Sequence, residues 1–422
     1  MSCYGFRRIA PAALALLGTG IAWADDPDAS ALMLADQTPS VVERAADWRT
    51  FVEGALGGTV RRSDGSTRDN RRLSADIQYE HSFSAEWRGF FSDRLDLNEP
   101  AQANDENAIN TLKEAYLTWR AQSETMLDLG RINVRNGVAL GYNPTDYFRS
   151  GALRSVVSIS PASLKENRQG SIMLRGQGLW ESGSATVLYS RKLDDRADPD
   201  GLSLDVGATN HRNRLLIAIS QKIGQTLTPQ ILVFGEEDRP TQFGLNLTGL
   251  IDDATVAHFE FSGGRSSSLL SQAQNLPAGS AWRNHLATGL TYTTPGKISL
   301  TLEYHYSGSG LDKEGWNALR QGPVAVYGEY RKRAQAAQEL PTRRAVFFYG
   351  TWQDALINRL DLSVMHNYDL IDSSRRLWLE ARYHLERFEY AVQWQRNSGQ
   401  HSSNFGAMPE SRSWQAVMRY YL

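Results

Sequence analysis

The feature that most constrains this fold is an alternation of apolar and polar side chains with a period of two residues. In the segment 298–306, Leu300 and Leu302 fall on one face of an extended chain, whereas Glu303 and His305 fall on the other. The same alternation recurs in the segments 72–82, 375–386 and 388–396. A period of two predicts β-strands with one apolar and one polar face.

The polar faces of these strands carry many ionised residues. A soluble β-sandwich also alternates, but it turns its apolar face to a core. A transmembrane β-barrel instead turns apolar residues to lipid and polar residues to its lumen, in runs of about ten residues. We therefore predict an all-β fold, a transmembrane antiparallel β-barrel. The charged residues assigned to its lumen are Glu80, Glu86, Arg88, Arg94, Asp96, Glu114, Arg120, Glu303, Glu380, Arg382 and Glu389.

The lengths of the connections support a membrane barrel. The alternation predicts eighteen strands between residues 48 and 422, and soft strand boundaries leave sixteen as an alternative. Gaps after even-numbered strands are one to three residues long, whereas most gaps after odd-numbered strands are long, such as 133–169, 194–212 and 308–342. Short periplasmic turns that alternate with long external loops are typical of outer-membrane barrels. A barrel of this size encloses an aqueous channel.

The chain ends within a predicted strand. Trp414, Met418, Tyr420 and Leu422 share one apolar face, with aromatic residues near both ends as expected at two membrane interfaces. In a closed barrel the last strand pairs with the first and needs no covering tail. The stripe resembles the C-terminal assembly signal of bacterial outer-membrane proteins, which the barrel-assembly machinery reads, although Leu422 stands where phenylalanine is usual.

The N-terminal segment 1–24 has the form of a secretory signal peptide. Arg7 and Arg8 precede an apolar run that ends at a small-residue cleavage site. We expect a periplasmic lead-in over 25–46 and the barrel over 47–422. The only cysteine, Cys3, leaves with the signal peptide, so we expect no cysteine metal site and no cofactor.

The charge of the mature chain argues against nucleic acid as a partner. Without Arg7 and Arg8, 43 basic residues stand against 47 acidic ones, a net charge of −4. No second apolar stretch approaches the length of a membrane-spanning helix.

The connection 133–169 differs from the other loops. Its 37 residues exceed the usual length of a structureless loop. Its net charge is +3, and it carries apolar residues that a freely solvated loop tip would lack, including Leu140, Tyr142, Phe148 and Val157. We predict that this loop folds inward and packs inside the barrel.

The segment from Gly130-Arg131 to Asn143-Pro144-Thr145-Asp146 resembles porin-like outer-membrane barrels of proteobacteria, including families related to alginate-export channels. In such barrels an inward-folded loop narrows the pore and lines the constriction with charges. The resemblance therefore implies Arg131, Arg135, Asp146, Arg149 and Arg154 as constriction candidates.

These observations predict a passive channel for small hydrophilic or anionic solutes in the outer membrane of a Gram-negative bacterium. Expected partners are outer-membrane lipid, lipopolysaccharide and the barrel-assembly machinery. A polymer-export channel with periplasmic partners is one alternative. A second is an enzyme that hydrolyses lipid esters, because His401 and Ser403 in "GQHSSNFG" resemble the catalytic segment of outer-membrane lipid hydrolases.

Overall fold

A computed structural model describes residues 47–101, 106–224, 226–276 and 280–422. The predicted signal peptide 1–24 and the expected lead-in 25–46 therefore both lie outside the described residues.

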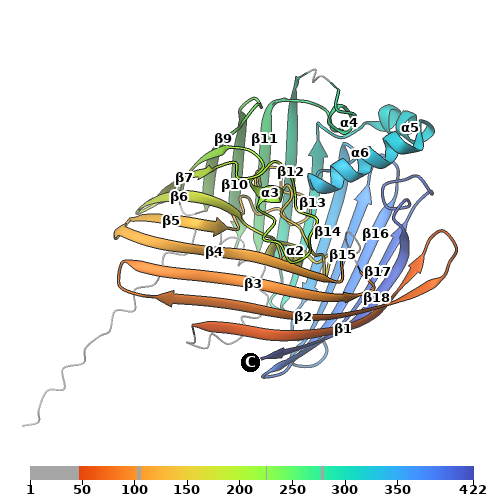
Figure 1. The fold of residues 1–422 in the computed structure, drawn as a ribbon, viewed down its shortest axis with the longest axis horizontal. Helices are drawn as coiled ribbons and strands as arrows, with labels where there is room; N and C mark the ends of the chain where they lie inside the picture. Colours follow the sequence, from red (N-terminus) through yellow and green to blue (C-terminus); the bar gives the residue numbers. More distant parts are fainter. Residues whose placement is uncertain (1–46, 102–105, 225, 277–279) are drawn as a thin grey trace, which may run out of the picture.

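Eighteen antiparallel strands form one closed sheet (Figure 1). Each strand pairs with its neighbours in sequence, and β1 also pairs with β18, so the barrel has no free edge. This confirms eighteen strands rather than sixteen. The strands are β1 Trp48–Arg61, β2 Thr67–Ser82, β3 Trp87–Glu99, β4 Ala108–Gln122, β5 Thr125–Ile132, β6 Ser171–Trp180, β7 Gly183–Ser190, β8 Arg214–Gln221, β9 Leu227–Glu236, β10 Gln242–Asp252, β11 Thr255–Ser266, β12 Ala281–Thr293, β13 Ile298–Ser307, β14 Arg344–Trp352, β15 Leu360–Asp369, β16 Arg375–His384, β17 Phe388–Ser398 and β18 Glu410–Tyr421.

The C-terminal strand closes the barrel as predicted. Its register sets Tyr421 opposite Phe51 and Trp414 opposite Gly58. Trp414 and Met418 are exposed on the outside of the barrel, which is the face that a bilayer covers in a transmembrane barrel. The absence of a side chain at Gly58 leaves room for the Trp414 indole, because a Cβ there would lie 3.1 Å from its Nε1 atom.

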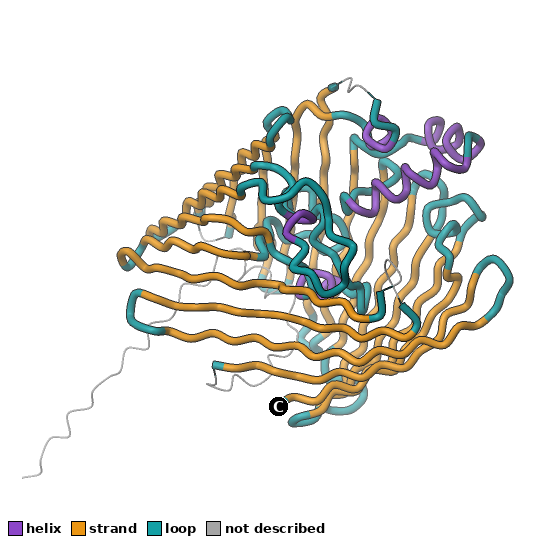
Figure 2. The backbone as a smooth tube through the Cα atoms, in the orientation of Figure 1, coloured by secondary structure: helices purple, strands orange, loops and turns teal. Residues whose placement is uncertain are grey.

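The connections separate the two ends of the barrel. Those that follow even-numbered strands span two to seven residues, slightly longer than predicted, because some turn residues leave the ladder. The long connections gather at the other end and hold the helices α2 Pro161–Glu166, α3 Val206–Thr209, α4 Leu269–Ala273, α5 Lys313–Gln321 and α6 Val324–Ala336. Figure 2 shows these loops over and inside the barrel mouth. No helix in the described ranges is long and apolar enough to cross a bilayer.

The inner wall along β1 to β3 and β16 to β18 carries many charged side chains beside apolar ones such as Trp378 and Val417. Glu53 on β1 is 3% exposed and accepts hydrogen bonds from three guanidinium groups. Its oxygens lie 2.7 Å from Arg72 Nη2, 3.0 Å from Arg94 Nη2 and 2.9 Å from Arg419 Nη2. Because Arg419 belongs to β18 and the other two arginines to β2 and β3, this carboxylate ties together the strands that close the barrel.

We predict that Glu53→Gln lowers the free energy of unfolding by about 3 kcal/mol, because it removes the only ion pair that the buried Arg72 makes within the described ranges and one ion pair each of Arg94 and Arg419. Urea unfolding of the protein in detergent micelles, followed by tryptophan fluorescence, measures this loss. Glu99→Gln is the matched control, since its ion pair with Arg71 is exposed and is worth about 1 kcal/mol or less. Equal losses in the two variants would contradict the role assigned to Glu53.

Candidate functional site: the loop inside the lumen

The connection between β5 and β6 lies inside the barrel (Figures 1 and 2). Two buried glutamates on the opposite wall hold its first part. Glu260 on β11 accepts hydrogen bonds from the backbone N–H groups of residues 138 and 139 at 2.5 and 2.6 Å. Glu303 on β13 accepts from those of residues 140 and 141 at 2.7 and 2.9 Å. Four consecutive amides are thus satisfied by two carboxylates, which confirms the predicted inward fold.

Two glycines permit this close approach. Gly137 has a φ of +78°, and a Cβ there would lie 2.6 Å from the Glu260 carboxylate. A Cβ on Gly141 would lie 2.4 Å from the ring of Phe347 and 2.7 Å from that of His305. Any side chain at either position would push the loop away from its carboxylate partners.

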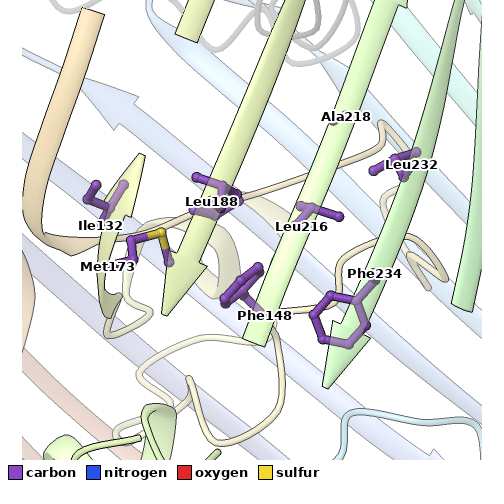
Figure 3. Packing of buried hydrophobic residues seen from close by; sticks show 9 residues of the cluster. Ile132, Phe148, Met173, Leu188, Leu216, Ala218, Leu232 and Phe234 are labelled. Atoms are coloured by element: carbon purple, nitrogen blue, oxygen red, sulfur yellow. The ribbon is translucent and has the colours of Figure 1, made fainter. Parts of the chain in front are cut away.

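The middle of the loop packs on an apolar part of the inner wall. Phe148 lies against Leu188, Leu216 and Phe234, which project inward from β7, β8 and β9 (Figure 3). Tyr147 stacks on Phe234 with ring centroids 4.5 Å apart. The prediction that the residues facing the lumen are polar is therefore wrong for β7 to β9. Apolar side chains face inward there because the loop covers them and excludes water.

Arg149 joins the loop to the connection 308–343. Its guanidinium forms an ion pair with Glu339, and it lies over the Tyr142 ring, 5.0 Å from the centroid. The Tyr142 hydroxyl donates to the other Glu339 oxygen at 2.7 Å. Burial alone disfavours the charged form of Glu339, but Arg149 and these hydrogen bonds hold its pKa below the ordinary value.

The last part of the loop reaches the charged wall. The Val157 carbonyl accepts hydrogen bonds from Arg72 Nη1 at 3.3 Å and from Gln415 Nε2 at 3.0 Å. Glu166, at the end of α2, lies 3.4 Å from the guanidinium of Arg49 on β1. The loop is therefore attached to walls on both sides of the lumen.

A cavity of about 1070 Å³ remains between Val157, the charged wall and the helices α5 and α6. Its lining includes the ends of strands that carry the long connections, so it lies on the loop side of Val157. Two acidic residues, Glu99 and Glu410, line it. The arginines that line it are Arg61, Arg62, Arg68, Arg71, Arg72 and Arg320.

The five constriction candidates differ in their hydrogen-bond and ion-pair partners. Arg131 donates to the Leu204 carbonyl at 2.8 Å, and Arg154 donates to the Ser203 and Asp200 carbonyls, so both hold the neighbouring connection 191–213. Asp146 forms a buried ion pair with Arg168. Arg149 pairs with Glu339 as described above.

Only Arg135 of the five is exposed without a hydrogen bond or ion pair in the described part of the chain. The other four candidates have partners that hold either this loop or the neighbouring connection 191–213 in place. None of the five lines the cavity.

Sequence reasoning missed the arginines of the cavity. Five of the six, at positions 61, 62, 68, 71 and 72, fall within the hairpin "RRSDGSTRDNRR" between β1 and β2. That basic cluster at a strand connection was the signal that could have identified them.

The alternative pair His401 and Ser403 lacks the geometry of a nucleophile and its base. The Ser403 hydroxyl is fully buried, donates to the Gln400 carbonyl at 2.7 Å and accepts from Gly406 N at 3.1 Å. The side chain of His401 is exposed. Ser403 thus stabilises the turn of this connection. Within the described ranges, no group of three or more histidine, cysteine, aspartate or glutamate residues is arranged to hold a metal ion.

Solved structures of porins share this fold. A BenF-like porin from Pseudomonas fluorescens superposes with a TM-score of 0.58 at 10% identity, covering 90% of this chain and 99% of that one. OccAB1 of Acinetobacter baumannii gives 0.56 at 10% identity, with 89% and 96% covered. The outer-membrane protein opdK of Pseudomonas aeruginosa gives 0.54 at 10% identity, with 89% and 99% covered.

No protein-family model matches the sequence. No curated protein sequence matches it either. The structural likeness supports the porin-like part of the resemblance and gives no support to the alginate-export part.

We predict that Gly137→Ala and Gly141→Ala release the loop from the two glutamates. A local cost of about 1.4 kcal/mol raises the released population about tenfold. Tryptic cleavage after Arg149 and Arg154, followed by mass spectrometry, should accelerate by about that factor.

Gly328→Ala is the control for this proteolysis, because a Cβ at that position in α6 meets nothing within 4 Å. Cleavage at the wild-type rate in both loop variants would contradict the anchoring described here.

The Arg149–Glu339 pair makes a pH-dependent contribution. Because the pKa of Glu339 is lowered from its ordinary value of 4.5, the pair contributes fully above that pH and is lost as the pH falls through the lowered pKa. We predict that acidification below pH 4.5 increases current fluctuations in a planar bilayer, and that Glu339→Gln shows them already at pH 7. Identical acid responses of the wild-type protein and this variant would contradict the assignment.

Proposed function

We propose that this barrel lies in the outer membrane of a Gram-negative bacterium and passes small hydrophilic solutes passively, with a preference for anions. One observation carries the proposal: a cavity of about 1070 Å³ opens above the loop, with arginines in excess over acidic residues in its lining. Positive charge in a narrow, low-dielectric opening concentrates anions there.

Two of these arginines are available to a solute. Arg61 and Arg68 are exposed and make no side-chain hydrogen bond or ion pair within the described ranges. By strand alternation both face the lumen. Arg72, deeper in the cavity, is held by Glu53 at 2.7 Å and contacts the loop at Val157. The exposed Arg61 and Arg68 would attract an anion into the cavity. Because Glu53 neutralises the charge of Arg72, the anion would not be trapped where the loop meets the wall.

The porin names of the structural neighbours agree with a channel. Those porins share only the fold with this chain at about 10% identity, so they do not identify a solute. A polymer-export channel is the weaker alternative, because a loop fixed to both walls of the lumen obstructs a wide path. We also propose that the protein is not an enzyme, because the Ser403 hydroxyl is engaged by the backbone of its own turn.

The outward stripe at the C-terminus supports one proposed partner. Trp414, Met418 and Leu422 are exposed on the barrel exterior or at its end, and Tyr420 shares their face. We propose that the barrel-assembly machinery reads this stripe during insertion.

Reversal potentials under a potassium chloride gradient test the proposed selectivity. We expect anion preference in the wild-type protein and, in Arg61→Gln/Arg68→Gln, a permeability ratio shifted toward cations by about twofold or more. Arg265→Gln is the control, because that arginine lies on the exterior by strand alternation, bonded to the Ser280 carbonyl at 2.8 Å. Cation preference that the double variant leaves unchanged would contradict the proposal.

A further inference from the structure

Three exposed arginines lie together on the outside of the barrel, near the end that carries the long connections. They are Arg375 on β16, Arg396 on β17 and Arg412 on β18. On these strands the residues of opposite parity, such as Trp378, Gln393 and Val417, are buried in the lumen, which places the three arginines on the outer face.

The strand register brings these arginines close to one another. Arg396 pairs directly with Arg412, so their Cβ atoms lie about 5 Å apart. Arg375 pairs with Ser398, two residues from Arg396, and is therefore the diagonal neighbour of Arg396 at about 7–8 Å. Side chains as long as arginine can converge on one small group across these distances.

This arrangement is unfavourable for the protein alone. Like charges directly opposite each other on neighbouring strands destabilise a sheet. In the described part of the chain none of the three guanidinium groups has an ion pair or a side-chain hydrogen bond. Arg265, another outward arginine, differs in this respect, since it donates to the Ser280 carbonyl.

Two tryptophans fix the depth of the cluster. Trp394 and Trp414 pair with each other on the same outward face, two residues along the strands from Arg396 and Arg412 and nearer the middle of the barrel. Below them this face is apolar, with Val392 opposite Ala416. Because tryptophan girdles sit at the membrane interface, the arginines lie at the level of the lipid headgroups and the apolar surface beneath them lies at the level of acyl chains.

We propose that Arg375, Arg396 and Arg412 bind a phosphate group of a phosphorylated glycolipid in the outer leaflet, of the lipopolysaccharide class. Guanidinium groups match phosphate oxygens in geometry and charge. The bound phosphate offsets the repulsion between Arg396 and Arg412, and the acyl chains cover the face below Trp394 and Trp414. The site rests on the proposed outer-membrane location and is independent of what the lumen conducts.

Native mass spectrometry of the full-length barrel in detergent, titrated with bisphosphorylated lipid A, tests this site. We expect the lipid to bind the wild-type protein and the control Arg265→Gln alike. Arg375→Gln/Arg396→Gln/Arg412→Gln should bind it at least about tenfold more weakly, which corresponds to about 1.4 kcal/mol. The heat-dependent shift of the folded barrel in electrophoresis verifies that each variant is folded, and the single variant Arg396→Gln, which removes one charge, should give an intermediate affinity.

Three outcomes would overturn the proposal. One is undiminished lipid A binding by the folded triple variant, and another is equal binding of dephosphorylated lipid A, which would assign the affinity to acyl chains. The third is competition by inorganic phosphate at the same low concentration as the lipid, which would assign the site to the free ion. The triple variant should keep wild-type conductance because its changes face outward, so a failed channel and a failed lipid site are distinguishable.

Discussion

The arrangement of the lumen depends on the hydrogen bonds between two carboxylates and four consecutive backbone amides. Glu260 and Glu303 are almost fully buried, and a buried carboxylate without partners is costly. Unsatisfied backbone N–H groups are costly as well. The two carboxylates accept hydrogen bonds from the four amides, so that both kinds of group are satisfied. The loop is thus held inside the barrel by groups that would each be costly to bury without the other.

This anchor divides the barrel into two unlike sides. On the side of β6 to β9, apolar residues such as Leu216 and Leu232 face inward and are covered by Phe148 and Tyr147. On the side of β16 to β3, charged residues organised around Glu53 line the wall, and the open cavity lies against their outer part. The loop thus packs against one side of the lumen and leaves a cavity open along the other side.

The fold could be predicted from the sequence because strand alternation, connection lengths and the C-terminal stripe are local patterns. The site could not, because the role of a loop arginine depends on what the fold brings to it. Arg149 meets Glu339, and Arg154 meets the Ser203 carbonyl, across 190 and 49 residues of sequence respectively. The apolar inner wall did leave a signal, since residues 215–219, Leu-Leu-Ile-Ala-Ile, do not alternate and predict burial on both faces.

The most direct test of the account is single-channel conductance in a planar bilayer, with and without the loop. Ile132 and Ser171 pair on adjacent strands, so a short glycine turn can replace residues 133–169 without opening the barrel. We expect a stable open step in the wild-type protein and a larger one after the replacement. Equal conductance of the two folded proteins would contradict a constriction at the loop, and no conductance in either would contradict the channel itself.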